Sequence, residues 1–186
     1  MITKAHTPTA GFSTFVANVV TWLQLAGIIL PKKFDTWYKK GLELSSSTLE
    51  SVKLPDDTYY AFGNNLFYAL ALYNSFQMAE FFGCTAIAHK LEEFCHSPIF
   101  GVKKSHDLWI LGQNEEPISR RLEKLGFRTS YFELYNSDIL TQLFESIFFV
   151  QNLVLLLAKK YEYAELQYVK MNDVLKASSD LIYAPQ

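Results

Sequence analysis

Residues 56–83 read DDTYYAFGNNLFYALALYNSFQMAEFFG, a stretch in which aromatic and aliphatic side chains recur every three or four positions. Asp56 and Asp57 stand ahead of it, where the N-cap of a helix is favoured. No charged residue and no proline follows before Glu80, and Gly83 provides an end. We therefore expect one central, largely buried helix over residues 59–82.

Two further helices are expected on the amino-terminal side of this stretch. Residues 12–30 carry no charge, and their apolar side chains repeat at helical spacing. Pro31 cannot continue that helix but suits the first turn of a second one, whose apolar stripe includes Trp37. Both helices have aromatic faces that need a surface to pack against.

The chain after the central helix is predicted in smaller pieces. Residues 87–94 indicate a short amphipathic helix. From about 98 to 136, glycines and Pro117 divide the sequence into segments that fit short helices joined by turns, including residues 105–111. Residues 131–135 have strand propensity, but a lone strand would have no partner.

A long helix is expected at the carboxyl-terminal end. Ser137 or Asp138 supplies its cap, and neither glycine nor proline occurs from there until Pro185. A length of 186 residues suits one domain. The predicted fold is therefore all-α: a single-domain helical bundle of about five to seven helices over residues 1–186, with an irregular short-helix region at about 98–136.

Composition limits the classes of function. The formal net charge of -2 gives no field that would attract nucleic acid, so no nucleic-acid partner is expected. Two cysteines do not make a disulfide framework, which favours an intracellular protein, either cytoplasmic or membrane-associated. The aromatic content of 16% is high, and it implies a large core or an apolar contact surface.

Common catalytic motifs are missing from the sequence. It contains no Gly-x-Ser-x-Gly elbow and neither of the usual glycine-rich phosphate loops. Glu93 and His96 have the spacing of a carboxylate and an imidazole in di-iron bundles, but the second motif that such a site needs is missing. We expect no catalytic residue, no cofactor and no bound metal, and we keep a metal-binding helical-bundle enzyme only as a third alternative.

The preferred prediction is a non-enzymatic helical interaction domain that uses an apolar, aromatic-rich surface. Excess apolar surface usually marks an interface, here with a protein partner or with a second copy of the chain. The candidate contact residues are Phe12, Phe15, Trp22 and Trp37.

The main alternative is an integral or peripheral membrane protein. The helices 12–30, 59–82 and 139–158 are each about long enough to span a bilayer. Their many amide side chains favour a protein environment over lipid. A local basic surface remains a candidate contact for anions or lipid headgroups, and it would comprise Lys103, Lys104, Arg120 and Arg121.

Overall fold

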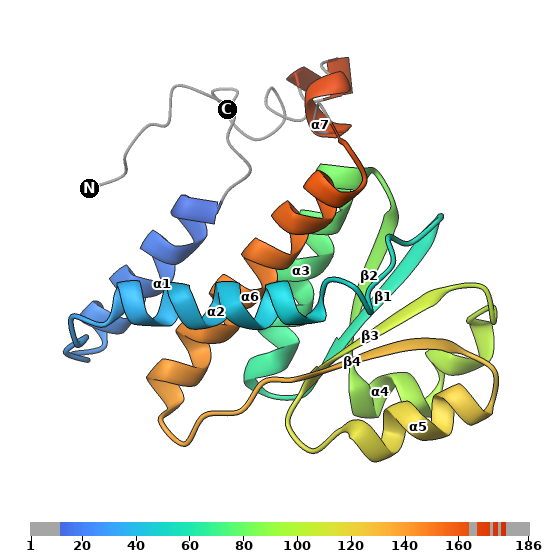
Figure 1. Ribbon diagram of the computed structural model, residues 1–186, viewed down its shortest axis with the longest axis horizontal. Helices are drawn as coiled ribbons and strands as arrows, with labels where there is room; N and C mark the ends of the chain where they lie inside the picture. Colours follow the sequence, from blue (N-terminus) through green and yellow to red (C-terminus); the bar gives the residue numbers. More distant parts are fainter. Residues whose placement is uncertain (1–11, 164–166, 172, 175, 178–186) are drawn as a thin grey trace.

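The computed structural model describes residues 12–163, 167–171, 173–174 and 176–177, and within them it has a four-stranded parallel β-sheet between two layers of helices (Figure 1). The strands are β1 (Thr58–Gly63), β2 (Thr85–Lys90), β3 (Asp107–Gly112) and β4 (Arg128–Glu133). Their order across the sheet is β2-β1-β3-β4, and every neighbouring pair is parallel.

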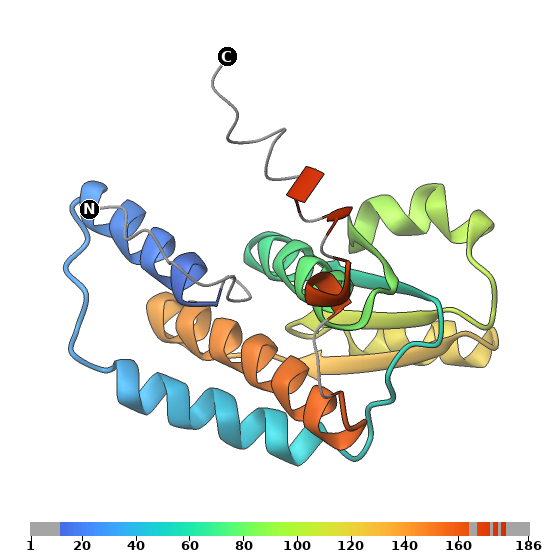
Figure 2. The same ribbon diagram turned by 90° about the horizontal axis from the view of Figure 1, so that it is seen from above.

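Helices cover both faces of this sheet. The larger layer contains α1 (Phe12–Leu25), α2 (Phe34–Thr48), α3 (Leu66–Phe82) and α6 (Ile139–Lys160). Figure 2 shows α6 with α1 on one side and α2 on the other. The opposite face carries α4 (Leu91–His96) and α5 (Glu116–Lys124), with a short 3-10 turn η1 (Pro98–Gly101), while α7 (Gln167–Lys170) lies beside the end of α3.

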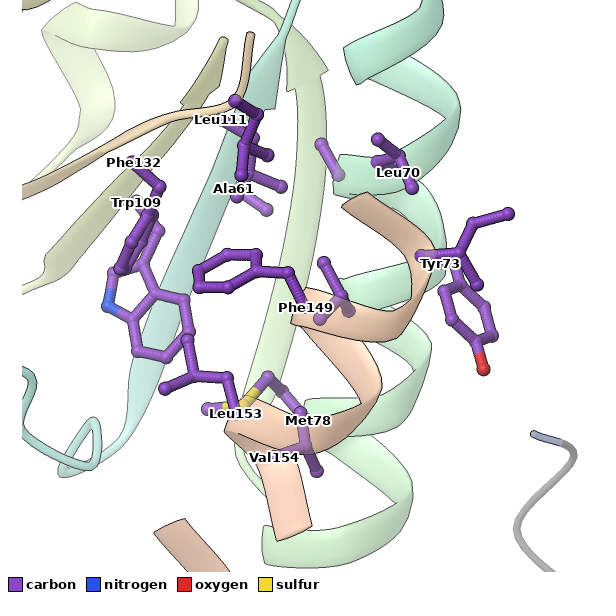
Figure 3. Close-up of a cluster of buried hydrophobic side chains, with 14 of the residues drawn as sticks. Ala61, Leu70, Tyr73, Met78, Trp109, Leu111, Phe132, Phe149, Leu153 and Val154 are labelled. Carbon is purple, nitrogen blue, oxygen red and sulfur yellow. The ribbon is translucent and has the colours of Figure 1, made fainter. Parts of the chain in front are cut away.

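Successive side chains of a strand point to opposite faces of the sheet, and they pack into two separate hydrophobic cores. On β3, Trp109 and Leu111 belong to the core beneath α3 and α6, whereas Leu108 and Ile110 belong to the core beneath α4 and α5. Figure 3 shows Trp109 facing Phe149 of α6. Because both faces are covered, the strands are apolar on both sides, as is typical of parallel sheets.

The prediction of an all-α bundle is wrong, and the stretch 56–83 shows why. Its residues Thr58–Gly63 form β1, which pairs with β2 on one side and β3 on the other. Asn65 has a φ of 50°, which no helix accommodates, so α3 begins only at Leu66. A strand that is buried on both faces has a continuous apolar sequence, and periodicity cannot separate it from a buried helix.

The other three strands were missed for a related reason. The helix expected over 87–94 is β2 followed by α4, and the one expected over 105–111 is largely β3. Residues 131–135 overlap β4, which pairs in register with β3 from Asp107 to Gly112. The partners of each strand come from distant parts of the chain, so local sequence could not reveal them. The extent of the single domain, 1–186, stays a prediction.

The expected cap of the long carboxyl-terminal helix is confirmed. The Asp138 carboxylate accepts a hydrogen bond from the backbone N–H of Thr141 at 3.0 Å, and its pKa is lowered by the Thr141 side-chain and backbone donors. The helix α6 that follows has 22 residues and packs extensively against α2 and α3. This helix therefore organises the larger layer.

A row of buried polar atoms along α3 gives a pH prediction. Burial raises the pKa of Glu80, whose Oε2 has no hydrogen-bond partner among the described residues. The folded state therefore favours the protonated form, so stability is highest below the unfolded-state pKa and falls as pH rises through the raised folded-state value. We expect Glu80→Gln to increase the free energy of unfolding at pH 7 and to have little effect near pH 4. Urea unfolding at pH 7 and at pH 4 measures the change in the free energy of unfolding. An equal change at the two pH values would contradict the prediction.

Candidate functional site

The carboxyl ends of β1 and β3 form a topological switch point of the sheet. These strands are neighbours, but β1 continues into α3 on one face and β3 into α5 on the opposite face. At such a switch point the two connections diverge, and ligands of open α/β sheets bind in the opening. The two loops that border it, 63–65 and 112–115, are the switch-point loops.

The first loop has little freedom. A Cβ on Gly63 would lie 2.3 Å from the carbonyl oxygen of Phe67, so only glycine lets the first turn of α3 pack against the end of β1. The carbonyls of Asn64 and Asn65 accept hydrogen bonds from Phe67 N–H at 2.9 Å and Tyr68 N–H at 3.2 Å. The loop therefore holds two amide side chains at the start of a 17-residue helix.

Backbone hydrogen bonds also hold the second loop in place. Leu134 N–H donates to the carbonyl of Gly112 at 2.8 Å, which ties this loop to the end of β4. Asn114 has a φ of 62°, a conformation that Asn tolerates better than most residues. The carbonyl of Glu115 accepts from Ile118 N–H at 3.1 Å and from Ser119 N–H at 3.2 Å, and α5 starts there. Residues in unusual backbone conformations cluster at functional sites.

A hydrogen-bond network joins the two loops and β4. Asn64 Nδ2 donates to Glu115 Oε1 at 3.1 Å across the switch point. Glu115 N–H donates to the Tyr131 hydroxyl at 3.3 Å, and this hydroxyl donates to Glu133 Oε2. Glu133 Oε1 in turn accepts from Asn114 N–H at 3.4 Å. Polar groups of the two loops and of β4 are thus held together at the carboxyl ends of the strands.

A pocket of about 350 Å³ adjoins this network between α2, α6 and the end of β4. The helices cross closely beside it, since a Cβ on Gly41 would lie 2.7 Å from Phe148 Cβ. Glu133 belongs to both the network and the pocket. The lining residues are Lys40, Gly41, Glu43, Leu44, Ser47, Glu133, Leu134, Tyr135, Gln142, Glu145 and Ser146.

The predicted contact residues whose side chains the structure describes, Phe15, Trp22 and Trp37, do not form one surface. Trp37 is 1% exposed, stacks on Phe144 and donates from Nε1 to Thr141 Oγ1 at 3.1 Å. Phe15 is half-buried and stacks on Tyr73 at 3.8 Å between ring centroids, whereas Trp22 is 72% exposed. Phe12 is the first residue of α1, and its side chain lies outside the described residues. Phe15, Trp22 and Trp37 do not line the pocket.

The four basic candidates are exposed, and no described contact links the two pairs. Lys103 and Lys104 precede β3 at the amino edge of the sheet, where Lys104 Nζ lies 3.4 Å from the centroid of the Phe127 ring. Arg120 and Arg121 lie on α5, and Arg120 pairs with Glu116 at 2.8 Å. Their role in binding anions or headgroups stays a prediction.

Neither alternative function finds a matching site. Glu93 is exposed and pairs with Lys90 at 3.0 Å, and the described residues contain no cluster of three or more metal-ligating side chains. Among them Ile139–Lys160 is the one helix long and apolar enough to cross a membrane, and 56% of its most apolar stretch is buried inside the molecule. The proposed span 59–82 is divided between β1 and α3.

Sequence reasoning missed the switch-point residues Asn64, Asn65, Asn114 and Glu115. One signal was present: TYYAFG and DLWILG are six-residue segments with one polar residue, an apolar run and a final glycine, and each is followed by a short polar run and then a helix. A strand, a glycine turn and a helix start in that order are typical of a parallel α/β unit. The two occurrences together could have indicated the sheet.

Similar solved structures share this fold. Glucosamine-6-phosphate deaminase from Thermotoga maritima aligns over 89% of this chain and 56% of its own, with 17% identity and a TM-score of 0.59. A protein from Salmonella typhimurium LT2 with a suggested sugar-binding role aligns over 67% of this chain and 44% of its own, with 13% identity and a TM-score of 0.53. The chain thus spans about half the length of these structures. No protein-family model and no curated protein matches its sequence.

These findings also correct the functional prediction. A non-enzymatic helical interaction domain presupposed helices packed only on helices, whereas the structure is a parallel α/β fold that is also found in an enzyme and in a protein with a suggested sugar-binding role. The aromatic side chains that suggested a contact surface instead largely fill the cores of this fold, as Trp37 and Trp109 do. The prediction of a protein partner, a second copy or a membrane remains untested.

Proposed function

We propose that this chain binds a small polyhydroxylated ligand of the sugar class at its switch-point loops. The observation that carries the proposal is the hydrogen bond between Asn64 Nδ2 and Glu115 Oε1, which joins the two loops across the switch point. This bond places an amide and a carboxylate at the switch point, the place in such sheets where ligands bind.

The side chains at the two loops suit hydroxyl groups. Asn64, Asn65, Gln113 and Asn114 offer amides that both donate and accept, and Glu115 offers carboxylate oxygens. Each sugar hydroxyl likewise donates and accepts, so a ring with several of them can satisfy such a set. The similarity of the fold to a glucosamine-6-phosphate deaminase and to a protein with a suggested sugar-binding role supports the same class of ligand.

The loops carry no basic residue, which disfavours a strongly anionic ligand held by their side chains. Neither 63–65 nor 112–115 contains Lys or Arg, and Glu115 adds a negative charge. A phosphate here would depend on backbone N–H groups alone, whereas phosphate sites generally add Arg or Lys. A neutral hydroxylated ring faces no such repulsion.

Titration of the ¹⁵N-labelled protein with D-glucose at millimolar concentrations tests the proposal. We expect amide shifts concentrated at residues 63–66 and 112–116, together with saturable binding. Asn64→Ala should weaken binding about fivefold, because one net hydrogen bond is worth about 1 kcal/mol.

The matched control is Asn18→Ala, an exposed amide on α1 that should leave the affinity unchanged. D-fructose, D-mannose and D-ribose extend the panel. If none of these sugars shifts the loop amides, or if Asn64→Ala binds as well as the parent protein, the proposed function is wrong.

A further inference from the structure

The pocket beside the switch-point loops has an excess of negative charge. Its lining includes the carboxylates Glu43, Glu133 and Glu145 against the single ammonium group of Lys40. Lys40 Nζ pairs with Glu43 Oε2 at 2.8 Å. The pairing leaves Glu133 and Glu145 as carboxylates for which no described lysine or arginine forms a salt bridge.

Both of these carboxylates are oriented by neutral donors. Glu133 accepts from Asn114 N–H and from the Tyr131 hydroxyl, and Glu145 Oε2 accepts from Asn136 Nδ2 at 3.4 Å. Neutral donors fix the position of a carboxylate without removing its charge. The pocket therefore keeps two negative charges in defined places.

The Ser146 hydroxyl in the same pocket has no hydrogen-bond partner among the described residues. Ser146 is 2% exposed and lines the pocket, and its Oγ forms no hydrogen bond with any described residue. The other serines on the neighbouring helix α2 bond to carbonyls of the preceding turn, as Ser45 does to Leu42 at 2.9 Å. Because Ser146 lines the pocket and its hydroxyl bonds to no described residue, this hydroxyl is available to a ligand in the pocket.

Gln142 is a second polar side chain of α6 that lines the pocket. This residue is 7% exposed, and its Nε2 donates to the Leu134 carbonyl at 2.9 Å. That bond fixes the amide and leaves its carbonyl oxygen without a described donor. On the α6 side, the pocket thus contains an acceptor from Gln142 and a hydroxyl from Ser146, which lie one helical turn apart.

We propose that this pocket binds a small primary amine that also carries a hydroxyl group, such as an amino sugar or an amino alcohol. The ammonium group lies between Glu133 and Glu145, where each hydrogen bond is strengthened by charge. The hydroxyl group bonds to Ser146 and Gln142. A volume of about 350 Å³ lies within the usual range of small-molecule sites. The proposal rests on the pocket and does not require the sugar site at the switch-point loops.

Calorimetry with two matched pairs of probes tests the proposal. D-glucosamine differs from D-glucose, and ethanolamine from ethylene glycol, by an amine in place of a hydroxyl. We expect D-glucosamine to bind about tenfold more tightly than D-glucose, because a charge-assisted hydrogen bond exceeds a neutral one by roughly this factor. Binding of ethanolamine but not ethylene glycol would indicate an amino-alcohol site, and binding of glucosamine alone an amino-sugar site.

Two variants locate the effect. Glu145→Gln keeps the shape of the side chain and should abolish the preference for the amine, and Ser146→Ala should weaken the binding of D-glucosamine about fivefold. Glu92→Gln, an exposed carboxylate on α4, is the control and should change nothing. Amide spectra without ligand verify that each variant is folded.

The outcomes separate this proposal from the proposed function. Equal affinity for each amine and its matched alcohol, no binding by either amine, or an amine preference that survives Glu145→Gln overturns the amine site. In each of these cases, amide shifts caused by D-glucose at residues 63–66 and 112–116 would still support the proposed sugar site. Amine binding that depends on Glu145 without any loop shifts by sugars would support the pocket and count against the sugar site.

Discussion

Gly63→Ala is expected to lower the free energy of unfolding by about 3 kcal/mol, near the upper end of the usual effects of overpacking. The added Cβ would meet the carbonyl oxygen of Phe67 at 2.3 Å and its carbonyl carbon at 2.4 Å. Both are backbone atoms at the start of α3, so no side-chain rotation relieves the contact. Either α3 moves away from β1 or the loop that carries Asn64 changes its path.

Urea unfolding followed by circular dichroism measures this effect. Gly101→Ala is the matched control, because a Cβ there has no atom within 4 Å, and it should change the stability by less than about 0.5 kcal/mol. Equal stability of the two variants would show that α3 and β1 do not approach as described. If Gly63→Ala remains folded, its altered loop should also reduce the response to D-glucose.

Trp37→Ala is expected to cost about 3–5 kcal/mol, the usual range when a fully buried large aromatic side chain is removed. Trp37 is 1% exposed and fills the space between α2 and α6. Its ring stacks on Phe144 with centroids 4.7 Å apart and meets the edge of Phe34 at 5.1 Å. The truncation leaves a cavity between the first turns of α2 and α6.

The same unfolding measurement with two further variants separates packing from hydrogen bonding. Trp37→Phe keeps an aromatic ring but loses the donor to Thr141, so a smaller loss is expected. Trp22→Ala is the control, because Trp22 is 72% exposed, and its effect should stay within about 0.5 kcal/mol. A larger loss for Trp22→Ala than for Trp37→Ala would reverse the roles of core and surface described for these residues.

The contrast between Trp22 and Trp37 shows the limit of reading contact residues from sequence. Both stand on helices that were predicted, and both belong to apolar stripes of similar spacing. Trp37 is covered because α6 packs over it through Thr141 and Phe144, which lie more than 100 residues further along the chain. Composition gives the amount of apolar surface, but the partner elements determine which part of it is covered.

The candidate site was hidden for the same physical reason. Asn64 and Glu115 are separated by 51 positions, and each is an ordinary polar residue in its own segment. They meet only because β1 and β3 are neighbours in the sheet although β2 lies between them in the chain. Likewise, Ser146 on α6 and Glu43 on α2 line one pocket because the two helices cross closely at Gly41.

The sequence by itself determined the features that depend on composition or on neighbours along the chain: the helical pattern of α2 and α6, the Asp138 cap and the high content of aromatic side chains. Only the tertiary structure decided that residues 58–63 are a strand rather than the start of a helix. An apolar segment of six residues can satisfy its backbone in either way, and the choice here follows from the hydrogen bonds that β2 and β3 provide on its two sides.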